Sequence, residues 1–279
     1  MIERIRDFEQ PETYITSGVA RAESNWAFSH TAALCWLAND GTVGENATLF
    51  FLEYDSCFGV TADHVVKRML EKSTEGAPIA LVGDRLLRIG DLEGRIIARD
   101  ESRDVATLQF APAEIAEAGK RCKVIDARWL IDHPISEGEY CFILGYPNDL
   151  RSADAGVRGR STTFETLQIM TRVGDIGERL LLMDIQRPEA ENENEAGLRD
   201  RLRRIAPPIA HNVRLSGISG SPVLAPRGRG GIRFLVLEGV VIGGPELLRD
   251  NPQETSMGIL RVARTNCIGP RGLIGNSGE

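Results

Sequence analysis

The sequence predicts an all-β protein built from two β units. Most apolar runs are short, rich in Val, Ile, Leu and Phe, and separated by Gly, Asp, Asn and Pro, which is typical of strands and turns. Helical patterns are few, and the candidate strands form two clusters at about 27–110 and 138–262. Many short strands with few helices favour sandwiches or barrels over helical or α/β folds.

The first cluster contains six candidate strands, at 31–38, 47–54, 57–62, 78–83, 94–99 and 105–110. The second contains six more, at 140–145, 166–173, 179–185, 221–225, 233–244 and 257–262. We expect short helices at 62–71, 112–121 and 195–204, and polar loops at 148–163 and 186–208. The predicted domains are an N-terminal extension (1–26), a first unit (27–125), a linker (126–137), a second unit (138–265) and a flexible tail (266–279).

Composition excludes several functional classes. The formal net charge of −7 is opposite to that of a typical nucleic-acid-binding protein. No apolar run reaches the roughly 18 residues of a membrane span, and the charged N-terminus lacks the apolar core of a secretory signal. We therefore expect a cytoplasmic protein with no nucleic-acid or membrane partner.

Cysteine and histidine usage predicts neither disulfides nor a metal site. The five cysteines are odd in number and contain no CxxC pair, which fits buried, reduced thiols. The four histidines lack HExxH or other ligand spacing. We expect no metal and no cofactor.

Three segments contain the residue types needed for nucleophilic catalysis. His64 follows an apolar strand in "VTADHVV", Asp104 precedes one in "RDVATLQF", and Ser219 lies between glycines in "GISGSPV". Each alone fits a structural role, because Asp, Gly and Ser are ordinary turn residues. Together they supply a nucleophile, a base to take its proton and a carboxylate to orient that base. The backbone N–H groups of Gly217 and Ser219 are candidates for an oxyanion hole.

At these residues the sequence resembles the trypsin-like (chymotrypsin-fold) serine peptidases, of a bacterial cytosolic type. The three segments resemble that family's Thr-Ala-Ala-His, Asp-φ-Ala-φ-Leu (φ apolar) and Gly-x-Ser-Gly-Gly-Pro-Val motifs, in the same order. "FILGYP" (142–147), "LEGVVIGG" (237–244) and "MGILRV" (257–262) resemble further segments of its second barrel. The resemblance spans about 27–265. It implies two six-stranded antiparallel β-barrels packed face to face, with the catalytic triad His64, Asp104 and Ser219 in the cleft between them.

Departures from the family pattern bear on activation. Ile218 stands where animal digestive members carry an Asp that pairs with a new N-terminus, so we expect no activation by that route. Val65 stands where the family has a disulfide cysteine, and Ser221 replaces the second glycine of the serine motif, where we expect a small residue to be tolerated.

The resemblance also implies a substrate pocket. Val213, six residues before Ser219, falls at the base of the family's main pocket, and Gly244 and Gly258 fall on its walls. This predicts an uncharged, apolar residue before the scissile bond. Ile242, Gly243 and Gly244 are expected to pair with the substrate backbone as an added strand.

The resulting hypothesis is a serine endopeptidase with narrow specificity for a polypeptide substrate, such as one partner protein. A non-catalytic binding or regulatory module on the same fold is the alternative, since fold does not fix function. An α/β-type serine hydrolase is disfavoured, because Ser221 breaks the Gly-x-Ser-x-Gly motif and the His precedes the Ser. His211 is the substitute base if His64 is misassigned, and 186–208 is either a solvated loop or a regulatory element.

Overall fold

A computed structural model gives the architecture of the protein. It describes residues 30–39, 43–72, 74–82, 85–117, 125–126, 135–148, 151–156, 159–164, 167–177, 180–185, 215–229, 232–244 and 258–275. The predicted N-terminal extension, the 186–208 segment and the 195–204 helix lie outside these residues. None of the described helices is long and apolar enough to cross a membrane.

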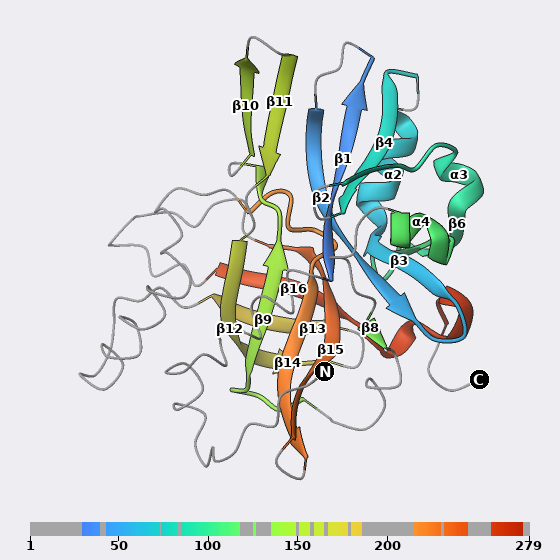
Figure 1. Ribbon diagram of the computed structural model, residues 1–279. Helices are drawn as coiled ribbons and strands as arrows, with labels where there is room; N and C mark the ends of the chain where they lie inside the picture. The colour runs from blue at the N-terminus through green and yellow to red at the C-terminus, as the bar shows by residue number, and fades with distance from the viewer. Residues whose placement is uncertain are drawn as a thin grey trace.

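The first β unit is a curled eight-stranded sheet (Figure 1). Seven strands follow the order β5-β4-β1-β2-β3-β7-β6, and β8 pairs with β2 in parallel. The strands are β1 (Thr31–Ala38), β2 (Val43–Glu53), β3 (Cys57–Ala62), β4 (Gly76–Val82), β5 (Arg85–Arg88), β6 (Ile96–Asp100), β7 (Val105–Gln109) and β8 (Ile125–Asp126). Three short helices belong to this unit, α2 (Asp63–Glu71), α3 (Leu92–Arg95) and α4 (Pro112–Glu117).

The second β unit is a closed six-stranded barrel, with strands in the order β12-β13-β16-β15-β14-β9. They are β9 (Tyr140–Gly145), β12 (Leu167–Ile176), β13 (Leu180–Ile185), β14 (Pro222–Arg229), β15 (Ile232–Gly243) and β16 (Gly258–Arg264). The predicted all-β class with two packed β units is confirmed. The six strands expected for the second unit are found, whereas the first unit has eight, because β5 and β8 add to the expected strands. Its end strands β5 and β6 are not paired with each other in the part of the chain that the structure describes.

Period-two alternation explains how the two units share a core. On β2, Leu49 and Phe51 belong to the interior of the first sheet, whereas Phe50 and Leu52 point to its other face. Phe50 and Leu52 share a buried cluster with second-barrel residues, among them Phe142 and Leu224. This strand thus contributes to two cores, which explains the four consecutive apolar residues at 49–52. The two units therefore pack against each other through buried side chains.

Two segments differ from the sequence prediction. The polar stretch predicted as a loop at 148–163 contains the hairpin β10 (Arg151–Gly156) and β11 (Gly159–Phe164) (Figure 1). The segment lacks the apolar alternation that signals a strand. In the part of the chain that the structure describes, its two strands pair only with each other.

The start of the predicted flexible tail is packed against the first sheet. It contains the 3₁₀ turns η4 (Thr265–Cys267) and η5 (Pro270–Gly272). The hydroxyl of Thr107 donates to the carbonyl of Gly272 over 2.6 Å, and Ile268 is buried.

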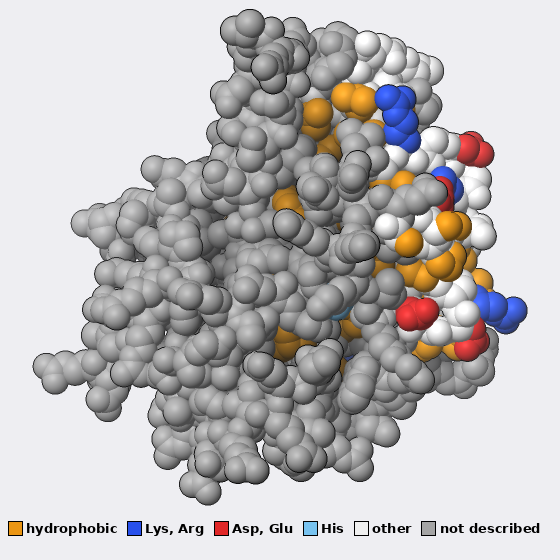
Figure 2. Space-filling model, viewed as in Figure 1, with side chains coloured by type: hydrophobic (Ala, Val, Ile, Leu, Met, Phe, Trp, Pro, Cys, Tyr) orange, Lys and Arg blue, Asp and Glu red, His pale blue; other side chains and the backbone are white. Residues whose placement is uncertain are grey.

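On the face seen in Figure 2, the described side chains over the first β unit carry both signs of charge, with Lys and Arg interspersed among Asp and Glu.

Candidate active site

Asp104 holds His64 through both its side chain and its backbone. Its Oδ2 lies 2.7 Å from Nδ1 of His64, and its Oδ1 accepts the backbone N–H of His64 over 2.7 Å. The backbone carbonyl of Asp104 also accepts the N–H of Asp63 over 3.1 Å. These bonds fix the position and rotation of the imidazole relative to the turn between β6 and β7, and they leave Nε2 of His64 for another partner.

The backbone of Asp104 adopts a conformation that few residues tolerate. Its φ is +56°, in the left-handed region where Asp and Asn are enriched among non-glycine residues. Such conformations cost about 1–3 kcal/mol and persist where surrounding bonds enforce them. The three bonds to Asp63 and His64 are of that kind, so the turn is built around the carboxylate.

The first turn of α2 is anchored from the opposite side by Arg99. The buried carboxylate of Asp63 pairs with the Arg99 guanidinium of β6, with 3.0 Å between Nη2 and Oδ2. The hydrogen bond to Asp63 raises the pKa of Arg99. An acidic side chain in a first helical turn also interacts favourably with the helix dipole. His64 therefore sits on a helix end that is tied to β6, to the β6–β7 turn and to β3.

Ser219 lies in a tight turn whose geometry requires two glycines. Gly217 has φ +103° and Gly220 has φ +87°. A Cβ on Gly220 would lie 2.0 Å from the carbonyl oxygen of Thr48 and 2.3 Å from Oγ1 of Thr61, so only glycine fits. The turn is joined to β15 by bonds from Gly220 N–H to the Val241 carbonyl (2.8 Å) and from Val241 N–H to the Ser221 carbonyl (2.9 Å).

Two amides of this turn are available to a ligand. The N–H of Ile218 donates to Leu215 and that of Ser221 donates to Ile218. The N–H groups of Gly217 and Ser219 donate to no other described residue. These are the two amides that the sequence predicts as the oxyanion hole.

Thr48 of β2 joins the turn that contains Ser219 to the first sheet. Its N–H donates to the Ser219 carbonyl over 2.9 Å, and its hydroxyl donates to the Gly217 carbonyl over 3.2 Å. The same hydroxyl accepts the N–H of Tyr146 over 3.2 Å, and the Thr48 carbonyl accepts the hydroxyl of Thr61 over 2.8 Å. Thr48 is fully buried. It therefore connects the Ser219 turn, β3 and the end of β9.

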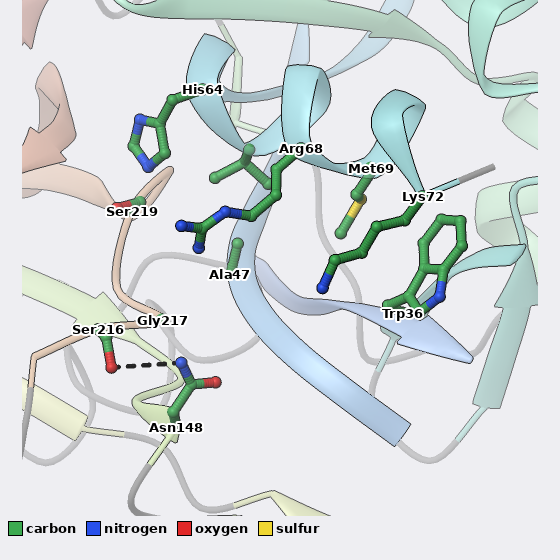
Figure 3. A pocket seen from close by; sticks show the side chains of 11 residues that line it. Trp36, Ala47, His64, Arg68, Met69, Lys72, Asn148, Ser216, Gly217 and Ser219 are labelled. Atoms are coloured by element: carbon green, nitrogen blue, oxygen red, sulfur yellow. Dashed lines mark hydrogen bonds between the residues drawn. The ribbon is translucent and has the colours of Figure 1, made fainter. Parts of the chain in front are cut away.

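A cavity of about 190 Å³ brings His64 and Ser219 together (Figure 3). The imidazole extends from α2 toward Ser219, and the side chain of His64 is 44% exposed. The wall of the cavity on the side of the first sheet includes Trp36, Ala47, Arg68 and Lys72. Its other wall includes Asn148, Ser216, Gly217 and Ser219. The cavity thus lies at the junction of the two β units.

The residues predicted for the substrate pocket either do not line the cavity of His64 and Ser219 or lie outside the described residues. Ile242 and Gly243 end β15, Gly244 follows it in an exposed position, and Gly258 begins β16. None of them lines the cavity of His64 and Ser219. Val213, like the substitute base His211, lies outside the described residues.

Sequence reasoning missed Thr48, Arg68 and Lys72. Arg68 and Lys72, the C-cap residue of α2, follow His64 at intervals of four residues, a spacing that places all three on one side of the helix. This spacing was a usable signal. Thr48 has none, because its partners are 98 and 169 residues away in sequence.

Ser221 fits because its neighbour is glycine. Ser221 is fully buried, and a Cβ on Gly145 would lie 2.3 Å from its Oγ. The Ser221 hydroxyl has no hydrogen-bond partner among the described residues. Gly145 of the "FILGYP" segment thus leaves the room that the side chain of Ser221 occupies.

Titratable clusters elsewhere do not form a metal site in the described residues. No group of three or more His, Cys, Asp or Glu side chains there is arranged to hold an ion. Cys35, Cys57, Cys141 and Cys267 are buried and form no disulfide with one another, and Cys122 lies outside the description. Burial raises the pKa of Cys57 to about 12, so its thiolate, the reactive form, is scarce at neutral pH.

The architecture is all-β, with the candidate site between its two β units. Neither the protein-family models nor the curated proteins contain a match to this chain. Among solved structures, the active form of the Rv3671c protease from M. tuberculosis is similar, with 16% identity and a TM-score of 0.42, covering 99% of this chain and 94% of that one. A structure concerning the intrinsically disordered Sesbania mosaic virus VPg protein has 13% identity and a TM-score of 0.43, covering 88% of this chain and 92% of its own.

Proposed function

We propose that this protein is a serine endopeptidase that hydrolyses peptide bonds through an acyl-enzyme. The observation that carries the proposal is the 2.7 Å contact between Asp104 and His64 in the cavity that also contains Ser219. A carboxylate on Nδ1 holds the imidazole in the tautomer whose Nε2 can accept a proton.

In the first half-reaction, Ser219 Oγ attacks the carbonyl carbon of the substrate and its proton passes to Nε2 of His64. The carbonyl oxygen becomes an anion, and the amides of Gly217 and Ser219 donate to it. The C–N bond then breaks, and the leaving amine takes the proton from His64. The products are a free amine and an ester on Ser219.

In the second half-reaction, a water molecule replaces the amine. His64 takes one proton from the water as its oxygen attacks the ester carbon, and the same two amides hold the second oxyanion. Collapse breaks the ester bond, and His64 returns the proton to Ser219 Oγ. The leaving amine takes the proton that Ser219 released, and Ser219 regains a proton from the water, so His64 and Ser219 end in their starting protonation states without a cofactor or metal.

Ile218 supports an enzyme that is competent as synthesised. It is 3% exposed and packs in the core of the second barrel with Leu215 and Val241. An apolar side chain there cannot form an ion pair with a new N-terminus. The two glycines and Thr48 instead hold the turn.

Labelling with a fluorophosphonate probe tests the proposal. The probe is expected to modify Ser219 in the wild type, and Ser219→Ala and His64→Ala should abolish that modification. Ser56→Ala, which alters an exposed serine in the β2–β3 turn, is the matched control and should label normally. A folded wild-type protein that is not labelled and cleaves no peptide would contradict the proposal and support a binding module.

A further inference from the structure

The cavity that contains Ser219 follows one face of α2. His64, Arg68 and Lys72 lie four residues apart, and all three line it (Figure 3). At 1.5 Å per residue, the Cα atoms of Arg68 and Lys72 lie about 6 and 12 Å beyond that of His64 along the helix. Two cationic side chains thus reach this cavity at increasing distance from the catalytic residues.

The rest of the wall contributes no opposing charge. Asn148, Ser216 and Gly217 form the opposite side, and no described residue that lines the cavity is acidic. Trp36 lines the far end of the cavity. The described lining therefore offers cations and neutral donors, which suit a carboxylate.

The position of the cavity identifies the part of the substrate that enters it. Residues before the scissile bond are expected to pair with 242–244, and none of those residues lines the cavity. Gly217, which supplies one oxyanion amide, and Ser216 do line it. We therefore expect a substrate to pair with 242–244 before the scissile bond and to pass Ser219 at that bond. The substrate residues that follow the scissile bond then enter this cavity.

We propose that this cavity is the leaving-group subsite and that it selects substrates with an acidic side chain two to four residues after the scissile bond. An extended peptide advances about 3.3 Å per residue, so its second and fourth residues reach about 7 and 13 Å, the levels of Arg68 and Lys72. Both cations already take part in other interactions in the resting protein, and the substrate carboxylate competes for them. This inference rests on the proposed peptidase activity and adds a substrate class to it.

The first test compares peptides that differ only in Glu or Gln at the second and fourth positions after the bond. The wild type is expected to favour the Glu peptide about fivefold to tenfold in kcat/KM. The preference should disappear in Arg68→Gln/Lys72→Gln and reverse in Arg68→Glu/Lys72→Glu. The Glu/Gln ratio is taken within each variant, so a change in the reactivity of Ser219 cancels.

The matched control is Lys67→Glu, which reverses a charge on the same helix. Lys67 is 57% exposed, lies 4.0 Å from Glu101 and does not line the cavity. It should leave the Glu/Gln ratio unchanged. A wild-type ratio near one, or an equal loss of preference in Lys67→Glu, would overturn the proposal. Peptides are amidated, and a preference seen only with a free C-terminus would assign the site to a terminal carboxylate instead.

A binding measurement separates this proposal from the proposed function. Fluorescein-labelled peptides that correspond to the leaving fragment are titrated into Ser219→Ala, and anisotropy gives their Kd. The Glu fragment should bind more tightly than the Gln fragment by a similar factor, and the difference should vanish with Arg68→Gln/Lys72→Gln. If the wild type cleaves nothing, the peptidase proposal fails, and this titration still decides whether the cavity selects a carboxylate. Equal affinities would refute the subsite.

Discussion

At the scale of single residues, Asp104 has a proposed chemical role, through the imidazole of His64, and a structural role, through the backbone N–H of His64. Its Oδ2 orients the imidazole of His64, and its Oδ1 accepts the backbone N–H of the same residue. Asp104→Asn separates the two roles, because Asn tolerates the φ of +56° and retains one acceptor oxygen. An Asn with its oxygen on the backbone N–H presents NH₂ to Nδ1 and holds the wrong tautomer.

We expect Asp104→Asn to lower kcat/KM by about 10³-fold or more while leaving the midpoint of urea unfolding close to that of the wild type. Peptide hydrolysis and urea titration measure the two effects. Asp104→Ala removes both acceptors and should also lower stability. An Asn variant within about tenfold of wild-type activity would show that the carboxylate does not orient the base.

Gly220, in the turn that contains Ser219, has no room for a side chain. Gly220→Ala adds a Cβ 2.0 Å from the Thr48 carbonyl oxygen at a φ of +87°, so the turn must shift. We expect the free energy of unfolding to fall by about 2 kcal/mol or more.

The control for this substitution is Gly90→Ala. Gly90 has φ +66°, and nothing lies within 4 Å of its added Cβ, so only the backbone strain remains. Chemical denaturation of both variants separates the clash from the strain. Equal losses of stability would mean that the turn moves freely away from β2.

At the scale of elements, β2 is hydrogen-bonded through Thr48 to the turn that contains Ser219. Thr48→Val preserves the shape of the side chain and removes the hydroxyl, which leaves the Gly217 carbonyl and the Tyr146 N–H without this partner in a buried site. We expect a loss of about 1–3 kcal/mol of stability. We also expect a lower kcat, because the carbonyl that fixes the backbone between the two oxyanion amides is released.

Thr265→Val is the matched control for Thr48→Val. Thr265 is also buried, and its hydroxyl donates to the Leu237 carbonyl over 3.1 Å, away from the Ser219 turn. It should lower stability by a similar amount without the loss in kcat. If both variants keep wild-type kcat when folded, the Thr48 bond supports the fold alone.

Elements with strong local patterns were predictable from the sequence. The strand predicted at 31–38 is β1 (Thr31–Ala38), and the helix predicted at 62–71 is α2 (Asp63–Glu71), because apolar composition and helical spacing are local properties. The hairpin of β10 and β11 was missed because it lacks that composition. The proposed roles of His64, Asp104 and Ser219 came from motifs, whereas the Thr48 bonds and the cavity along α2 arise only when distant segments meet.

At the scale of the whole molecule, the two β units share a core, and the second barrel also contains a cluster of charged side chains with little exposure. The second barrel contains Arg227 between two carboxylates, with Nη2 2.8 Å from Glu139 Oε2 and 3.0 Å from Glu238 Oε1. The Glu238 side chain is 9% exposed. Burial raises the pKa of Glu238 to about 7, and Glu139 adds to this effect while Arg227 and Arg264 oppose it.

This raised pKa makes stability fall as the pH rises. The unfolded chain releases the Glu238 proton near pH 4.5, whereas the folded protein retains it up to about pH 7. Between these values the folded state binds more protons than the unfolded state. The stabilising contribution of the Glu238 proton is therefore fully present below pH 4.5 and is lost as the pH rises through 7. The shift corresponds to a contribution of about 3 kcal/mol at most.

Glu238→Gln tests this linkage, because Gln is neutral at every pH and keeps an acceptor for Arg227. We expect the variant to match the wild type near pH 4.5 and to be more stable above pH 7, so that the slope between these values becomes flatter. Urea unfolding at a series of pH values measures the slope. Glu53→Gln, at an exposed position at the end of β2, should leave it unchanged. A Glu238→Gln curve parallel to that of the wild type would mean that Glu238 is ionised throughout the range and that Arg227 outweighs the cost of its burial.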